Sequence, residues 1–164
     1  MTLLTKKEAM QMIIKSSKLD HSIMVSKIMV FLAKNLQLHT EEWELTGLLH
    51  DLDYDLTKDA GSQHGIKAAE ILGNKVSSTV SYAIKAHDPG NRYEANTTLD
   101  KGLILADCLA WLIDDQRLLE LDINLMSAME KEAAIKPKIV QNIRSYSKIF
   151  SISLEKIIEE LKLK

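Results

Sequence analysis

Apolar residues recur at helical spacing along almost the whole chain. Met24, Val25 and Ile28, for example, fall on one face of a helix, because residues three and four positions apart lie on the same side. The same spacing predicts helices over residues 5–16, 20–36, 40–52, 64–72, 75–87 and 100–116, and two or three more between 121 and 164. We therefore expect an all-α fold.

Polar stretches and capping residues divide the predicted helices. Residues 53–63 and 88–98 form the two longest predicted loops, and Pro89 with Gly90 ends the helix before the second loop. Ser153 is the expected N-cap of the last helix. The chain contains no repeat, low-complexity tract or linker, so residues 1–164 are expected to form a single-domain helical bundle.

Composition narrows the class of protein further. Of 164 residues, 46% are hydrophobic and 27% are charged, with a formal net charge of −2, which is typical of a globular protein and gives no reason to expect a nucleic-acid polymer as partner. Cys108 is the only cysteine, so no internal disulfide can form. We see no signal peptide and no apolar stretch suited to a membrane, and therefore expect a cytoplasmic protein.

Several polar residues interrupt the apolar faces of the predicted helices. His21 lies on the same face as Met24 and the apolar residues that follow it, and His87 ends the apolar face of helix 75–87. His50 and Asp51 end another helix, one turn after Gly47, which permits close approach of a neighbouring element. These positions predict side chains that point towards the core.

Asp107 is the most informative of these polar residues. It is the only charged residue between Leu103 and Ile113, so we expect its carboxylate to be buried. An unpaired buried carboxylate costs several kcal/mol, and a bound cation removes that cost. Any one of these residues alone could be a hydrogen-bonded or ion-paired core residue. Two imidazoles and two carboxylates together favour a divalent metal site, whereas His39 is expected at the surface.

The order of these residues resembles the H…HD…D pattern of the HD superfamily of metal-dependent phosphohydrolases. The segments LTGLLHDLDYD, IKAHD and LDKGLILADCLAWL carry the resemblance, which covers about residues 10–116 and is strongest to the small predicted HD hydrolases. It implies a helical bundle of the HD-domain type. Residues 117–164 lie outside the resemblance and are expected to pack on that core.

The resemblance also implies a set of metal ligands. The residues that match the ligands of a first metal are His21, His50, Asp51 and Asp107. His64 and His87 match two further histidines of relatives that hold two metals, in which the aspartate of the doublet bridges the ions. The implied cofactor is thus one or two divalent transition metal ions, namely Fe, Mn, Zn, Ni or Co.

The implied reaction is hydrolysis of a nucleotide or another small phosphate ester by a metal-activated water. Asp51 would hold the metal, and Asp53 or Asp55 could orient the water or protonate the leaving group. The candidate phosphate-binding cations on or beside the two polar loops are Lys58, Arg92 and Lys101. Tyr54 stands where some nucleotidase relatives carry a glutamate, and the GYP segment of cyclic-dinucleotide phosphodiesterases is absent, so those specialised activities are not expected.

Two other functions are compatible with the same ligands. Some HD proteins hold two irons and use oxygen to cleave organic substrates, and a non-catalytic interaction domain could keep the ligands for folding. The chain is expected to be a monomer or a homodimer, since the apolar face of its last helix could pair with a copy or pack on its own bundle.

Overall fold

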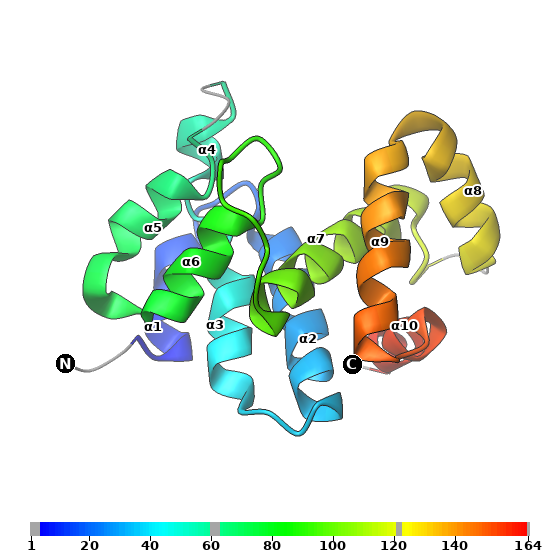
Figure 1. The fold of residues 1–164 in the computed structure, drawn as a ribbon, viewed down its shortest axis with the longest axis horizontal. Helices are drawn as coiled ribbons and strands as arrows, with labels where there is room; N and C mark the ends of the chain where they lie inside the picture. The colour runs from blue at the N-terminus through cyan, green and yellow to red at the C-terminus, as the bar shows by residue number, and fades with distance from the viewer. Residues whose placement is uncertain (1–3, 60–62, 121–122, 164) are drawn as a thin grey trace.

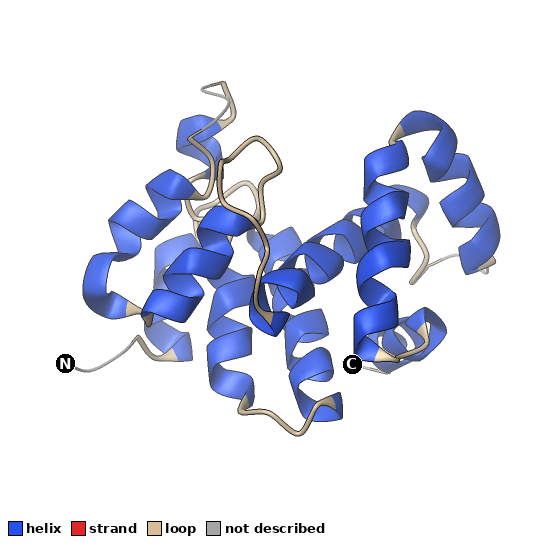
Figure 2. Ribbon diagram, in the orientation of Figure 1, coloured by secondary structure: helices blue, strands red, loops and turns tan. Residues whose placement is uncertain are grey.

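The computed structural model describes residues 4–59, 63–120 and 123–163. All regular structure in these ranges is helical, which confirms the predicted all-α class (Figure 2). The helices are α1 (Lys6–Ile13), α2 (Leu19–Asn35), α3 (Thr40–Leu49), α4 (Tyr54–Thr57), α5 (Ile66–Leu72), α6 (Ser78–Ala86), α7 (Thr98–Gln116), α8 (Leu125–Ile135), α9 (Pro137–Phe150) and α10 (Leu154–Lys162), with a 3₁₀ turn at Gly73–Lys75. Within the described ranges, none of these helices combines the length and apolar character needed to cross a membrane.

Helices α2 and α3 form a hairpin that brings the start of one beside the end of the other (Figure 1). Gly47 makes this possible, because a Cβ atom there would lie 2.7 Å from the Cα of Ser26. The close approach expected at Gly47 is therefore present. It places the first turn of α2, with His21, next to the residues that follow α3.

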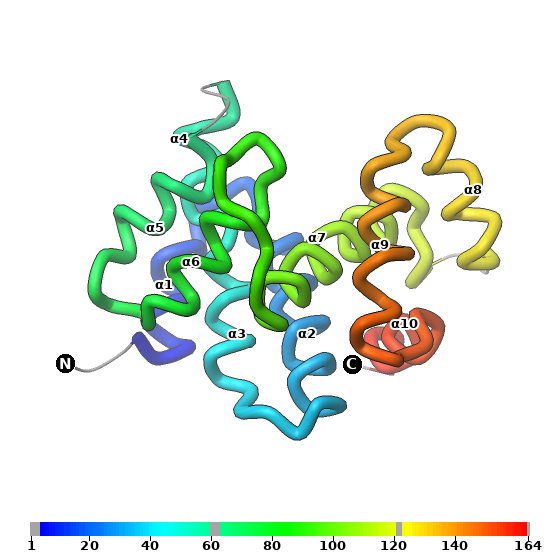
Figure 3. The backbone as a smooth tube through the Cα atoms, in the orientation of Figure 1, coloured from blue at the N-terminus to red at the C-terminus, as the bar shows by residue number. Residues whose placement is uncertain are grey.

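Helix α7 crosses the middle of the molecule (Figures 1 and 3). It contacts α2, α3 and α6 of the N-terminal helices, and α8 and α9 of the C-terminal ones. A capping box fixes its start, since Thr97 Oγ1 accepts from the Asp100 amide and Asp100 Oδ2 accepts from the Thr97 amide. The helix therefore begins at Thr98, two residues before the predicted start.

The C-terminal helices pack against this central helix rather than standing apart. Gly102 of α7 lies against both Trp43 of α3 and Phe150 of α9. Aromatic rings from both halves of the chain therefore pack against this one glycine. Helix α10 packs on α2 and buries Ile157 and Leu161. Its apolar face is thus covered by the same chain.

Helix boundaries near the polar loops differ from the predicted ones. The short helix α4 lies inside the predicted loop 53–63, and Thr57 Oγ1 donates to the carbonyl of Asp53 there. Helix α5 begins at Ile66 rather than at His64, because Gly65 before it has φ of 75°. His64 consequently lies in the turn before the helix.

Candidate metal centre

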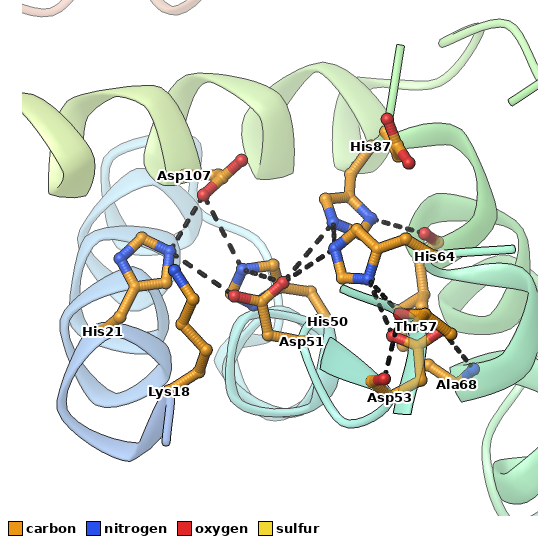
Figure 4. A network of polar contacts seen from close by, with 12 residues as sticks. Lys18, His21, His50, Asp51, Asp53, Thr57, His64, Ala68, His87 and Asp107 are labelled. Carbon is orange, nitrogen blue, oxygen red and sulfur yellow. Dashed lines mark hydrogen bonds and ion pairs between the residues drawn. The ribbon is translucent and has the colours of Figure 1, made fainter. Parts of the chain in front are cut away.

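The ends of several helices bring six imidazole and carboxylate side chains together (Figure 4). Three of the contributing segments directly follow or precede a helix, and the other two belong to two different helices. The six residues are His21 of α2, His50 and Asp51 after α3, His64 before α5, His87 after α6, and Asp107 of α7. They are the six residues that the sequence indicated as ligands.

The first group consists of His21, His50 and Asp51, whose ligand atoms all lie within 4.8 Å of one another. Asp107 adjoins it, with Oδ1 2.9 Å from His21 Nε2 and 3.7 Å from His50 Nε2. Two ligand atoms bound to one ion at about 2.1 Å and at right angles are about 3 Å apart, so these separations suit joint coordination.

The second group consists of Asp51, His64 and His87. Asp51 Oδ1 lies 3.0 Å from His64 Nε2 and 3.8 Å from His87 Nε2, and the two imidazole nitrogens lie 3.2 Å apart. Asp51 belongs to both groups. One carboxylate is therefore placed to serve two cations.

The outer ring nitrogens are held by partners that turn Nε2 towards the centre. Nδ1 of His50 contacts the carbonyl of Gly47 at 2.8 Å, and Nδ1 of His87 contacts the carbonyl of Ile84 at 2.6 Å. A carbonyl can only accept, so each ring donates from Nδ1 and directs Nε2 towards the centre, as the atom that would bind a metal.

Charge in the centre is shared between carboxylates and imidazoles. Burial lowers the pKa of His21, but hydrogen bonds to Asp107 and Asp114 outweigh burial and raise it to about 9. Burial likewise lowers the pKa of His64, and the nearby aspartates raise it to about 10. Burial raises the pKa of Asp51 and Asp107, but the neighbouring imidazoles hold both well below their usual range. A cation would take the place of the imidazole protons.

One buried atom tests whether the residues fit a metal. His50 Nε2 is buried and has no hydrogen-bond partner among the described residues, although Asp51 Oδ1 is 3.5 Å away and Asp107 Oδ1 is 3.7 Å away. Leaving such an atom unsatisfied costs about 1–3 kcal/mol. A divalent cation would satisfy it, and imidazole with carboxylate donors suits Fe, Mn, Zn, Ni or Co. The residues therefore fit the group.

Asp53 and Asp55 lie behind or outside this centre. Asp53 is fully buried, with Oδ1 2.9 Å from His64 Nδ1 and Oδ2 accepting from the Ala68 amide at 3.0 Å. Asp55 is exposed and accepts from the backbone amide of Ser17 at 2.9 Å. Asp53 is thus placed to orient an imidazole, and Asp55 to tie α4 to the start of α2.

The three predicted phosphate-binding cations are not brought to the centre. Lys58 and Arg92 are exposed, Lys101 is half-buried, and none of them lines the cavities beside the six residues. The cavity over the centre, of about 200 Å³, is lined by the candidate ligands other than His50, together with Lys18, Tyr54, Asp88, Pro89 and Trp111.

Lys18 and Trp111 were not predicted from the sequence as site residues, although helical spacing relates each of them to a candidate ligand. Lys18 lies three residues before His21, and Trp111 lies four residues after Asp107, so each shares a face with a candidate ligand. The same cavity leaves the Asp107 side chain 31% exposed. The expectation that Asp107 would be buried was therefore only partly right, because its helix faces a cavity at this position.

An all-α bundle with this arrangement of histidines and aspartates defines the HD-type class of metal-dependent hydrolases. Residues 19–112 match the HD domain family, so the chain belongs to that family. The match covers more than half of the chain and spans all six candidate ligands. No curated protein and no solved structure matches the chain.

Proposed function

We propose that this protein is a metal-dependent phosphohydrolase that cleaves a small phosphate ester, nucleotides included. The main support for this proposal is that Asp51 belongs to both ligand groups and that these groups lie beneath one open cavity. HD-domain proteins are generally phosphohydrolases, and two adjacent cations can stabilise both the attacking and the leaving oxygen. We propose one divalent ion in each group, with Asp51 shared.

The protein side chains around the cavity would bind and orient the substrate. Lys18 forms no ion pair among the described residues, and its ammonium lies 4.3 Å from the centroid of the Tyr54 ring. It therefore keeps its charge available for a phosphoryl oxygen. Trp111 forms a second aromatic wall of the cavity beside Tyr54.

The bound ions would lower the pKa of the attacking water and neutralise charge on the phosphoryl group. The side chains of the protein would hold the ions and keep the ligands in position. Asp51 and Asp107 supply the negative charge that holds the ions, and His21 presents Nε2 to both carboxylates at 3.9 Å and 2.9 Å. Asp53, which cannot reach the cavity, would position His64 rather than touch the substrate.

The test is a hydrolysis screen with a matched pair of histidine variants. Protein supplied separately with Mn, Fe, Zn, Ni or Co is assayed on p-nitrophenyl phosphate, nucleotides and other phosphate esters. His21→Asn is expected to lower kcat/KM at least 100-fold, because it removes one ligand and the partner of Asp107. His39→Asn is the control, since His39 is exposed and lies away from the centre.

Other outcomes of this screen would identify a different function. Bound iron with a mixed-valent signal, and no ester hydrolysed, would replace this proposal with a di-iron oxygenase. A lower melting temperature on chelation, without hydrolysis or binding of any phosphate compound, would indicate a metal-stabilised interaction domain.

A further inference from the structure

A second cavity, of about 390 Å³, lies beside the candidate metal centre. It shares His87, Pro89 and Asp107 with the cavity over the centre, so the two are neighbours around the same residues. Its other wall comes from Lys136, Lys138 and nearby residues at the α8–α9 junction. Those residues lie outside the stretch that matches the HD family.

The charge of this cavity is positive. Lys136 and Lys138 both line it, and neither forms an ion pair among the described residues. The one acidic residue in its described lining is Asp107, whose carboxylate is already 2.9 Å from His21 Nε2. Two lysines therefore line a space whose described lining holds no other carboxylate than that of Asp107.

Geometry fixes Lys136 near the reacting centre. Its ammonium lies 3.4 Å from the centroid of the Trp111 ring, and Trp111 also lines the cavity over the metal ligands. A lysine held over an aromatic face keeps its charge and loses part of its freedom. Lys136 thus stands at the junction of the two cavities.

Asn142 and Cys108 add neutral hydrogen-bonding groups to the cavity. Asn142 Nδ2 donates to Cys108 Sγ at 3.6 Å, and a sulfur is a weak acceptor that leaves most of the donor capacity of the amide unused. Ile104 and Ile139 supply apolar surface between these groups.

We infer that this second cavity binds a further anionic group of the substrate, a phosphate or a carboxylate, through Lys136 and Lys138. The substrate class is then a phosphate ester with a second anion on its leaving portion, whose connecting atoms lie on Ile104 and Ile139. The inference rests on the proposed function, because it assumes that a phosphoryl group occupies the metal centre. It also gives the C-terminal helices a role in substrate selection.

Non-hydrolysable phosphonates of graded length test this inference by calorimetry on the metal-bound protein. The probes are alkylphosphonates, phosphonocarboxylates and bisphosphonates with one to four methylene groups between or beyond the anions. At least one probe with two anions is expected to bind 10-fold or more tightly than the alkylphosphonate of the same length, as charge-assisted hydrogen bonds form. Comparing carboxylate with phosphonate as second anion identifies which group the cavity takes.

The double variant Lys136→Gln with Lys138→Gln is expected to reduce that preference to about twofold or less. Lys148→Gln, at an exposed position on the same helix, is the control and keeps the full preference. A preference that survives in the double variant, or that is absent from the unaltered protein, overturns the inference. Failure of every phosphonate to bind, together with failure of every ester to be cleaved, would instead overturn the proposed function.

Discussion

At the scale of single residues, the candidate histidine ligands differ in the group that contacts Nδ1, the ring nitrogen that points away from the centre. Backbone carbonyls hold His50 and His87, whereas a carboxylate holds His64. An anionic partner makes an imidazole a stronger donor to a metal and fixes its orientation. Asp53 is not a candidate ligand itself, but it orients His64 and strengthens it as a donor in the second ligand group.

Asp53→Asn is expected to weaken metal binding about 10- to 100-fold, because His64 loses its anionic partner. Chelator competition measures this affinity. The rate at saturating metal should change little, since Asp53 is buried away from the cavity. Asp55→Asn is the matched control and should leave the affinity unaltered. A large loss of rate at saturating metal would mean that Asp53 takes part in the reaction itself.

The histidines also set the pH dependence of the metal-free protein. The pKa of His21 is raised from 6.5 to about 9, and that of His64 to about 10. A pKa raised on folding stabilises the protein fully below about pH 6.5, and this contribution is lost as the pH rises through 9 to 10. Urea unfolding with chelator present should therefore show a free energy of unfolding that falls over this range.

His64→Gln should make the same pH dependence shallower, because one of the two titrating groups is gone. Metal affinity should change in the opposite direction and rise with pH, since bound protons must leave before the ion can bind. A free energy of unfolding that stays level or increases between pH 6.5 and 10 would contradict the charge distribution described for the centre.

At the scale of helices, the hairpin of α2 and α3 is what brings His21 to His50. Gly47 is the residue that permits their close approach, and its place one turn before the HD doublet was visible in the sequence. The start of α5 was less visible. Gly65 has a positive φ, and a Cβ there would also lie 2.5 Å from the carbonyl oxygen of Ile84, which is a contact between distant segments.

Gly47→Ala is expected to destabilise the fold by about 1–3 kcal/mol, because the new methyl group meets the backbone of Ser26 rather than a side chain that can move. Thermal unfolding measures the effect, and metal affinity should fall with it as His50 is displaced. In Gly90→Ala the nearest contact is the movable Asp88 side chain, so stability should stay close to that of the unaltered protein. Equal melting temperatures for the two variants would contradict this account.

At the scale of the whole molecule, the sequence indicated which candidate ligands come together, but not which other residues line the cavity above them. His21 and Asp107 stood out because each interrupts an apolar face, and interruption is a local property of the chain. The predicted phosphate-binding cations Lys58, Arg92 and Lys101 are near the histidines in sequence, but none of them lines the cavities beside the centre. Lys18 shares a helical face with His21, which is a local pattern, whereas only the packing of distant helices places Lys136 beside the centre.

Counting metal ions per chain in protein purified without added metal tests whether Asp51 serves two ions. Elemental analysis of the unaltered protein should give close to two divalent transition metal ions per chain. Asp51→Asn should bring that number below one, because both ligand groups lose a shared carboxylate. A variant that retains as much metal as the unaltered protein would contradict the assignment of Asp51 as the bridge.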